Sequence, residues 1–403
     1  MHIVYSNHPL PTSITKSIFM AGPSPRSLQE TDWRHDALKT LADLGFDGTV
    51  FVPVPDYRFE RNQMSDAENG WNYLAQVTWE VEARKMADII AFWLARDIDR
   101  SKEDLGMPGF VTNFEMGEDL HSGKIAYGRP PTAPKCRYMD KRIEELGQPA
   151  HATMTELFTE VMTRLGDGAL RTGGEAYVPL LIWRLESFQG WYTNLQKAGN
   201  RLDGADLLNV MVVGGKHVFS FMLKVNVWIA AEQRHKTNEF IFARKDISTI
   251  FAFHRSPTTG LVHVALVREF RSPVSNETGY VYELAGGSAV KANVDPQENA
   301  QHELEEELGL HIADAKRFQY IGQRQLASTL SVHRAQLYAV ALTTEEFETL
   351  SASVAAKTVF GVVEDSERTF VELTTLDQLL TVPLDYSMLG MVYEAAIKLG
   401  LTH

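Results

Sequence analysis

The sequence contains a single cysteine, Cys136, among its 403 residues. This excludes a disulfide within the chain and favours a reducing compartment. Apolar runs approaching the ~20 residues that span a bilayer are absent, and so is a basic start followed by an apolar stretch that would indicate a signal peptide. We therefore expect a cytoplasmic protein with no membrane partner.

Positive charge is scarce relative to negative charge. The formal net charge is −13, from 39 Lys and Arg against 52 Asp and Glu. A broad nucleic-acid binder needs a basic surface that replaces counterions along the phosphate backbone, so the composition argues against this class. Small anionic substrates remain compatible, because a metal ion or a few arginines can dominate the local field.

The 13 histidines show no spacing that is typical of metal ligands, so a zinc site is not expected. Internal repeats and low-complexity tracts are also missing. The apolar fraction of 44% is typical of a globular protein, and the length predicts two domains plus a connector. We place these at residues 1–148, 149–235 and 236–403.

The first region, 1–148, alternates strand-like and helix-like segments. Short apolar runs predict strands at 18–21, 50–52, 89–94 and 124–127. Helical patterns around 33–41, 79–87 and 114–120 separate these runs. Strands that alternate with helices indicate an α/β domain with a parallel sheet.

The two following regions have different patterns. Apolar residues at helical spacing over 154–165 predict a helix, and we interpret 149–235 as a mainly helical connector or as a packing or dimerisation element. The sequence therefore leaves open whether the protein forms a homo-oligomer. From 236 onward, short strands dominate, with helices at 298–308, 344–350 and 389–399. This pattern predicts an α+β domain and makes the whole chain a multidomain α/β protein.

The predicted helix 298–308 carries an unusual concentration of carboxylates. Glu303, Glu306 and Glu307 are spaced i, i+3 and i+4, so they share one face. Like charges at this spacing are mildly destabilising, unless a divalent cation such as Mg²⁺ or Mn²⁺ is bound by several carboxylate oxygens. The alternative for four glutamates alone is a solvated acidic face.

The surrounding residues favour the metal interpretation. The segment from His302 to Leu310 resembles the second half of the Nudix box. Upstream, Glu283-Leu284-Ala285-Gly286-Gly287 and the strand 266–273 resemble the corresponding parts of ADP-ribose-pyrophosphatase-like members. The resemblance implies a Nudix fold for 236–403.

The resemblance to the Nudix family also implies roles for individual residues. The metal ligands would be Glu303, Glu307, Glu283 and the carbonyl of Ala285. Glu306 would be a further ligand or would position the base. A phosphate or a terminal ribose would meet Arg268 or Arg271. The substrate would be a nucleoside diphosphate derivative such as ADP-ribose, hydrolysed with Mg²⁺ or Mn²⁺.

Two positions depart from the Nudix pattern. His302 occupies the place of the box arginine, and Val294 that of the glutamate before the seven-residue spacer. The loop from Gly287 is also one residue longer. Because the arginine orients a glutamate, these departures leave two alternatives: a hydrolase, or a nucleotide-sensing protein that binds without cutting.

The first region also carries candidate acidic groups. Glu115 lies in a predicted helix within Asn113-Phe114-Glu115-Met116-Gly117, and Glu80 lies in the preceding helix. Ligands of open α/β sheets bind beyond the carboxyl ends of the strands. Asp88 precedes its strand and is less well placed by that rule than Arg96 and Asp97. A carboxylate near a helix start is often only a favourable charge.

These segments, together with Ile18-Phe19-Met20-Ala21-Gly22-Pro23 and Gly123-Lys124, resemble nucleoside 2-deoxyribosyltransferase-like domains. The resemblance implies that Glu115 attacks the anomeric carbon and that Glu80 is an acid near the base or sugar. Substrate-binding residues would be Gly22, Asp88 and Asn113. The domain would cleave or transfer an N-glycosidic bond of a small-molecule nucleoside or nucleotide.

The sequence thus predicts a two-site nucleotide-processing enzyme with a metal-dependent Nudix-type hydrolase domain. The nucleotide-sensing protein is the alternative. A third interpretation treats both domains as scaffolds.

Overall fold

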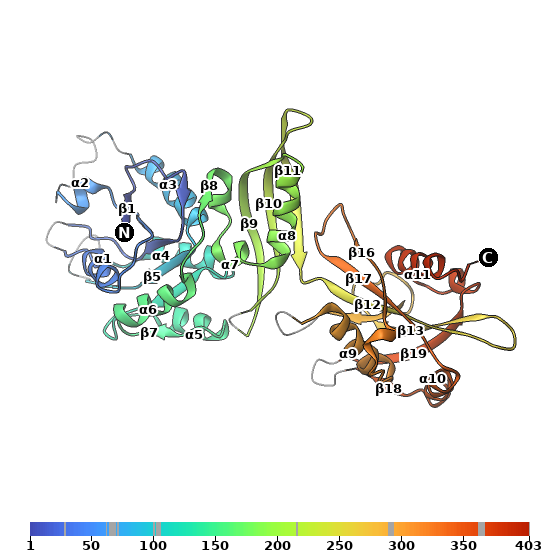
Figure 1. Ribbon diagram of the computed structural model, residues 1–403. Helices are drawn as coiled ribbons and strands as arrows, with labels where there is room; N and C mark the ends of the chain where they lie inside the picture. Colours follow the sequence, from blue (N-terminus) through green and yellow to red (C-terminus); the bar gives the residue numbers. More distant parts are fainter. Residues whose placement is uncertain are drawn as a thin grey trace. The chain divides into compact units, whose positions relative to one another are not determined.

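The computed structural model describes residues 1–27, 30–61, 63, 70, 72–99, 101, 106–214, 217–288, 294–361 and 367–402 (Figure 1). The chain divides into two compact units, Met1–Ala243 and Arg244–His403. Within the described ranges, no helix is long and apolar enough to cross a membrane.

Unit 1 is built on a six-stranded sheet. In spatial order its strands are β1 (His2–Tyr5), β4 (Thr49–Val52), β3 (Ser17–Ala21), β5 (Ile89–Trp93), β6 (Ile125–Gly128) and β7 (Ala150–His151). All neighbouring pairs are parallel. The central strands β3, β4 and β5 are apolar along their length and buried throughout, as expected for a sheet covered on both faces. The predicted parallel sheet is confirmed.

Helices cover both faces of this sheet. The helices α1 (Arg34–Asp43) and α6 (Met154–Leu165) share one apolar cluster with it. The helices α3 (Tyr73–Met86), α4 (Phe110–Asp119) and α5 (Arg137–Glu145) share the opposite cluster, while the short α2 (Asp56–Phe59) follows β4. The chain therefore leaves β3 toward one face and β5 toward the other. A crevice forms between the carboxyl ends of such neighbouring strands.

The segment 149–235 differs from the predicted helical connector. Its first helix, α6, packs on the sheet of unit 1, and η1 (Gly173–Tyr177), α7 (Leu180–Trp183) and α8 (Glu186–Lys197) follow. The chain then forms a three-stranded sheet of β9 (Arg201–Val213), β10 (His217–Ile229) and β11 (Arg234–Arg244). Three register shifts interrupt the pairing of β9 with β10. These irregularities break the alternation of apolar and polar residues by which strands are recognised in a sequence.

Unit 2 contains a mixed sheet. Its main path runs β16 (Gln319–Gln325), β17 (Arg334–Ala341), β12 (Ile247–Arg255), β13 (Val262–Phe270), β19 (Thr369–Thr375) and β18 (Val359–Phe360). β14 (Tyr280–Glu283) pairs with β13, and β15 (Ala285–Gly287) pairs with β12. β12 and β17 are parallel, whereas β12 and β13 are antiparallel. The prediction of a strand-rich mixed domain is confirmed.

The sheet of unit 2 lies between two helical layers. The helices α9 (Pro296–Leu308) and α10 (Thr344–Ala356) share an apolar cluster with one face, and α11 (Tyr386–Lys398) shares a cluster with the other. The N-cap residue of α9 is Asp295, whose side chain accepts the N–H groups of Gln297 and Glu298. It ends at Gly309, which adopts the left-handed conformation with φ of 69°.

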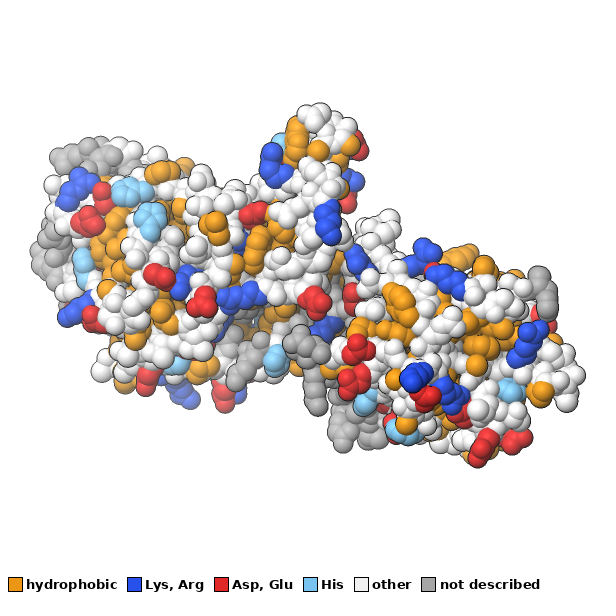
Figure 2. All heavy atoms as spheres, viewed as in Figure 1, with side chains coloured by type: hydrophobic (Ala, Val, Ile, Leu, Met, Phe, Trp, Pro, Cys, Tyr) orange, Lys and Arg blue, Asp and Glu red, His pale blue; other side chains and the backbone are white. Residues whose placement is uncertain are grey.

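Surface charge of both signs is mixed. Figure 2 shows Lys and Arg side chains among Asp and Glu side chains over the visible face. Ion pairs such as Arg317–Glu346, at 2.6 Å, contribute to this mixture. Partly exposed pairs of this kind add little stability, so the two folds depend mainly on their apolar clusters.

Candidate functional sites

The connection between β3 and α1 is fixed by buried hydrogen bonds from Arg34. Its Nη2 donates to the carbonyl of Gly22 at 2.9 Å, and its Nε donates to the carbonyl of Met20 at 3.2 Å. A Cβ built on Gly22 would lie 2.4 Å from the carbonyl oxygen of Trp93 at the end of β5. Glycine is therefore required at this position by the neighbouring strand, and the loop is held at the mouth of the crevice.

Two carboxyl groups, Glu80 on α3 and Glu115 on α4, have raised pKa values. Burial and the charge of Glu80 raise the pKa of Glu115 to about 7, although Arg84 and Arg34 oppose this rise. Burial also raises the pKa of Glu80, whose Oε1 accepts a hydrogen bond from Gln76 at 2.9 Å. Glu80 and Glu115 form an acidic pair in which the charge of Glu80 disfavours ionisation of Glu115.

Two neighbouring carboxyl groups can supply both functions that glycosidic chemistry requires. A negative charge on one of them disfavours ionisation of the other. The ionised group can attack or stabilise an oxocarbenium-like carbon, and the protonated group can donate to a leaving base. The positive charges of Arg34 and Arg84 partly offset the negative charge of Glu80 and Glu115.

The start of α4 is positioned by the end of β5 and by the β3–α1 loop. Arg96, which follows β5, donates to the side-chain oxygen of Asn113 and, at 3.0 Å, to the carbonyl of Lys135. Gly109 precedes α4 with φ of 65°, and a Cβ there would lie 2.9 Å from Cγ of Pro23. These contacts fix the turn of α4 that leads to Glu115.

Asp88 lies at the amino end of β5, away from this crevice. Both of its carboxylate oxygens accept hydrogen bonds from Arg171 at 2.7 Å, and Oδ2 also accepts the N–H of Ser17 at 2.9 Å. Leu180 donates its N–H to Oδ1 at 2.7 Å. Asp88 is 2% exposed, and both of its carboxylate oxygens have hydrogen-bond partners. The prediction that Asp88 shapes the substrate pocket is therefore corrected to a structural role.

A pocket of about 260 Å³ lies beyond the carboxyl ends of β3 and β4. Its lining includes Ser24, His35, Pro53, Arg58, Phe59 and Gln76. The His35 and Phe59 rings stack with centroids 3.9 Å apart. Because Gln76 also contacts Glu80, the pocket adjoins the acidic pair.

In unit 2, the α9 glutamates pack against β15. Glu307 is 4% exposed, and its Oε2 accepts the N–H of Gly286 at 2.8 Å. A Cβ built on Gly287 would lie 2.7 Å from Oε1 of Glu303. The Glu-Leu-Ala-Gly-Gly segment therefore brings backbone directly against the acidic face of the helix.

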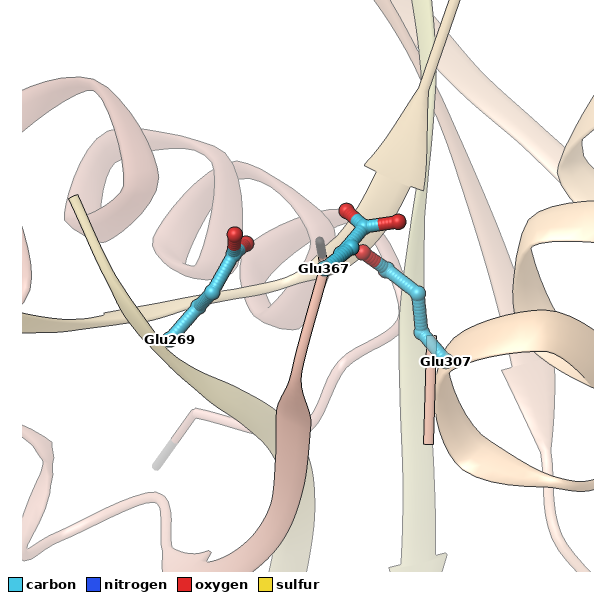
Figure 3. A group of neighbouring side chains, drawn as sticks. All are labelled: Glu269, Glu307 and Glu367. Atoms are coloured by element: carbon cyan, nitrogen blue, oxygen red, sulfur yellow. The ribbon is translucent and has the colours of Figure 1, made fainter. Parts of the chain in front are cut away.

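Two further carboxylates complete an acidic cluster with Glu307. Glu269 on β13 and Glu367, just before β19, each place an oxygen within 4.8 Å of the others and of a Glu307 oxygen. Figure 3 shows the side chains converging from these three segments. Neither Glu269 nor Glu367 was among the sequence-predicted ligands. Glu269 follows the core residues Ala265 and Val267 at two-residue spacing. This spacing indicates that Glu269 lies on the same face of the strand as the core residues.

Three glutamates at this cluster have raised pKa values, Glu269, Glu303 and Glu307. Burial raises the pKa of Glu269 to about 7, with Arg271 lowering it and Glu367 raising it. Burial, Glu306 and Glu367 raise the pKa of Glu303 to about 7. Burial raises the pKa of Glu307 well above its usual value, although the N–H of Gly286 opposes this. A hard divalent cation would match this oxygen-rich donor set.

The two candidate arginines lie in different places. Nη2 of Arg271 is 2.8 Å from Oε2 of Glu269 and 3.0 Å from Oε2 of Glu283. Arg271 therefore lies at the cluster, and Glu283 is its ion-pair partner. Arg268 pairs with Glu372 at 2.9 Å and stacks over the rings of Tyr280 and Phe370.

Arg268 lies on the opposite face of β13 from Glu269, because adjacent strand residues point to opposite faces. Of the two arginines predicted to meet a phosphate or a terminal ribose, Arg271 is the one that lies beside the acidic cluster, and the substrate contact stays a prediction. The carbonyl of Ala285, another predicted ligand, is buried and accepts the hydroxyl of Thr249 at 3.3 Å.

His302 and Glu306 are neighbours on α9. Nδ1 of His302 lies 3.2 Å from Oε2 of Glu306, at i,i+4 spacing. The residue that replaces the box arginine therefore contacts a box glutamate. Val294 precedes the N-cap residue Asp295 and lies outside the helix.

Comparison with known proteins identifies a matching family for part of unit 1. Residues 15–130 match the family described as "Nucleoside 2-deoxyribosyltransferase like". This range includes Gly22, Glu80 and Glu115, and it confirms the resemblance noted for the first region. No curated protein sequence matches the chain. Among solved structures, a mutT/nudix family protein from Listeria innocua is similar at 18% identity, over 39% of this chain and 94% of that chain, with a TM-score of 0.29.

Proposed function

We propose that the protein is a nucleotide-processing enzyme with two active sites. Unit 1 cleaves or transfers the N-glycosidic bond of a nucleoside or nucleotide. Unit 2 hydrolyses the diphosphate linkage of a nucleoside diphosphate derivative such as ADP-ribose, using Mg²⁺ or Mn²⁺. The observation that carries the proposal is the gathering of carboxylates in each unit. In unit 1 the pKa values of Glu80 and Glu115 are raised. In unit 2 Glu269 and Glu307, both with raised pKa values, lie in one cluster with Glu367.

In unit 1, Glu115 is the proposed nucleophile. Its carboxylate oxygen attacks the anomeric carbon while the bond from that carbon to the base nitrogen breaks. The departing base takes up a proton from solvent, and Glu80 is the neighbouring acidic group whose charge tunes Glu115. Water or a second base then attacks the anomeric carbon and releases Glu115. The match of residues 15–130 to a deoxyribosyltransferase-like family supports this assignment.

The proposal for unit 1 is tested by base release from a panel of nucleosides and nucleotides without Mg²⁺. Glu115→Gln should reduce release by a factor of about 100 or more, because the attacking carboxylate is lost. Glu82→Gln is the matched control, since Glu82 pairs with Lys85 on the exposed side of α3. Undiminished release by Glu115→Gln would contradict the role given to Glu115.

In unit 2, the residues that would hold a divalent ion are Glu269, Glu307 and Glu367, with Glu303 beside them. Their fit to a metal rests on burial of several carboxylates in one place, which is unfavourable without a cation. When bound, such an ion polarises phosphoryl oxygens and acidifies water. Glu306, next to His302, is the group that we assign to positioning the attacking water.

The proposal for unit 2 is tested with ADP-ribose and Mg²⁺. Wild-type protein should form AMP and ribose 5-phosphate, and Glu307→Gln should lose this activity. The contact between His302 and Glu306 supports a hydrolase, because it gives that glutamate a partner where the box arginine is missing. Saturable binding of ADP-ribose without turnover would instead identify a nucleotide-sensing unit.

A further inference from the structure

The helices α3 and α4 run in the same direction on one face of the sheet of unit 1. Both share an apolar cluster with that sheet. α3 leads into β5 and α4 leads into β6, and β5 and β6 are parallel, so both helices run antiparallel to the strands. The two helices therefore present their successive turns to each other in the same order.

Arg84, in the last turn of α3, joins the two helices. Its Nη1 donates to Oδ2 of Asp119 at 2.6 Å, and its Nη2 donates to Oε2 of Glu118 at 2.9 Å. Both acceptors are at the end of α4, and the side chains of Arg84 and Asp119 are largely buried. A planar guanidinium that binds two carboxylates of one helix restricts both the distance and the rotation of that helix.

The carboxyl groups of Glu80 and Glu115 lie one helical turn away from this ion pair. Glu80 precedes Arg84 by four residues on α3, and Glu115 precedes Asp119 by the same interval on α4. Residues at this spacing share one face of a helix. Because the two helices are joined through these faces, Glu80 and Glu115 face each other one turn nearer the carboxyl ends of the strands, where the crevice lies.

The burial of Arg84 is unfavourable for the fold. Its Nε is buried and has no hydrogen-bond partner among the residues that the structure describes. An unpaired buried N–H group costs free energy, and the desolvation of a buried guanidinium can exceed its attraction to a carboxylate. Buried polar groups of this kind are frequent where a site requires a charge at one place.

Charged side chains from three helices act on Glu115. Burial, Glu80 on α3 and Asp119 on α4 itself raise its pKa, which lies at about 7. Arg84 on α3 and Arg34 on α1 oppose this rise. Arg34 is bound to carbonyls of the β3–α1 connection, whereas Arg84 is bound to the helix that carries Glu115. The positive charge of Arg84 therefore keeps its place relative to that helix.

We infer that Arg84 is a positioning residue for Glu115. Its ion pairs hold α4 against α3 at the turn next to the two carboxyl groups, and its positive charge favours the ionised form of Glu115 that attacks the anomeric carbon. Arg84 acts through Glu115 and not by contact with the substrate. The inference rests on the function proposed for unit 1 and makes it more specific.

The inference is tested in the full-length protein by carbon-13 NMR of the glutamate carboxyl groups, with the signal of Glu115 assigned by its loss in Glu115→Gln. Arg84→Met should raise the pH at which Glu115 ionises by about one pH unit, the lower end of the usual effect of a nearby opposite charge. The acid limb of base release should move to higher pH with it. Arg84→Lys keeps the charge and should restore both.

Asp119→Asn separates the charge of Arg84 from packing of the helices. It breaks the same ion pair as Arg84→Met, but it removes a negative charge that raises the pKa of Glu115. Glu115 should therefore ionise at lower pH in Asp119→Asn and at higher pH in Arg84→Met. A purely structural role of the ion pair would shift the ionisation in the same direction in both variants.

Lys85→Met is the matched control for Arg84→Met. It removes one positive charge from the next position of α3, where Lys85 pairs with Glu82 at 2.9 Å and with Asp206 at 3.2 Å. The ionisation of Glu115 should stay as in wild type.

The NMR titration does not need turnover, so it separates failure of this inference from failure of the proposed reaction. Unchanged ionisation of Glu115 in Arg84→Met and Asp119→Asn, or shifts in the same direction, would overturn the inference, whether or not base is released. Opposite shifts without base release by wild type would retain the inferred control of Glu115 and reject the reaction. If Arg84→Met fails to fold, Arg84→Gln takes its place in the same comparison.

Discussion

The carboxylate of Glu303 lies directly against the α-carbon of Gly287, so that a Cβ at this glycine would be 2.7 Å from Oε1. We predict that Gly287→Ala displaces Glu303 and weakens Mn²⁺ binding by a factor of about 10–100, the usual effect of disturbing the support of a metal ligand. Calorimetric titration with Mn²⁺ measures this change.

Gly390→Ala is the control for Gly287→Ala. Gly390 lies in α11 of the same unit, and its added Cβ would meet no atom within 4 Å. This variant should bind Mn²⁺ like wild type and should be slightly more stable, because alanine is the better helix former. Equal Mn²⁺ affinity in Gly287→Ala and wild type would show that Glu303 does not support the ion.

Glu367 is expected to be a metal ligand despite its distance from the acidic helix in the sequence. Glu367→Gln should reduce Mn²⁺ affinity about 10–100-fold and lower Mg²⁺-dependent turnover with it. Glu372→Gln is the matched control, since Glu372 lies on nearby β19 and pairs with Arg268. If both variants bound Mn²⁺ equally well, the three converging carboxylates would not be the metal site.

The pH dependence of base release should report the coupling of Glu115 to Glu80. Burial and the Glu80 charge raise the pKa of Glu115 to about 7. A nucleophilic carboxylate must be ionised, so kcat/KM should fall as the pH decreases through about 7. Glu80→Gln removes a negative charge that disfavours ionisation of Glu115. The acid limb should therefore move to lower pH, whatever the loss in rate.

Profiles of kcat/KM against pH for wild type and Glu80→Gln test this coupling. An acid limb that stays at the same pH in Glu80→Gln would mean that a group other than Glu115 titrates there. Glu82→Gln should leave the limb unchanged, because Glu82 is engaged with Lys85 at 2.9 Å.

The buried pair of Asp88 and Arg171 should affect stability. Asp88→Ala leaves the guanidinium of Arg171 buried without its partner, which costs about 3–5 kcal/mol in the free energy of unfolding. Asp140→Ala, which breaks a more exposed pair with Arg129, should cost less. Urea unfolding measures both. Unchanged stability of Asp88→Ala together with lost base release would return Asp88 to the substrate site.

Local patterns in the sequence predicted much of this architecture. The parallel sheet of unit 1 followed from apolar runs alternating with helical periodicity. The spacing of Glu303, Glu306 and Glu307 placed them on one helical face, and the structure puts Glu303 and Glu307 against the glycines of β15. Such features are contained within a few turns of chain, where periodicity is informative.

Features that depend on distant pairing were harder to predict. Glu269 joins Glu307 only because β13 and α9 share one apolar cluster, and Glu367 joins them because β19 pairs with β13. Of Arg268 and Arg271, the two arginines predicted to meet the substrate, strand alternation directs Arg268 to the face of β13 opposite Glu269. Asp88 adjoins a site motif in sequence, but Arg171 binds it from 83 residues away.

The central claim of two independent sites is tested most directly by one product-resolved assay. Wild type, Glu115→Gln and Glu307→Gln are incubated with the same nucleotide panel, with and without Mg²⁺, and free base is separated from phosphate products. We predict that Glu115→Gln loses base release and keeps Mg²⁺-dependent diphosphate cleavage, while Glu307→Gln shows the reverse. Loss of both activities in either correctly folded variant would contradict the account.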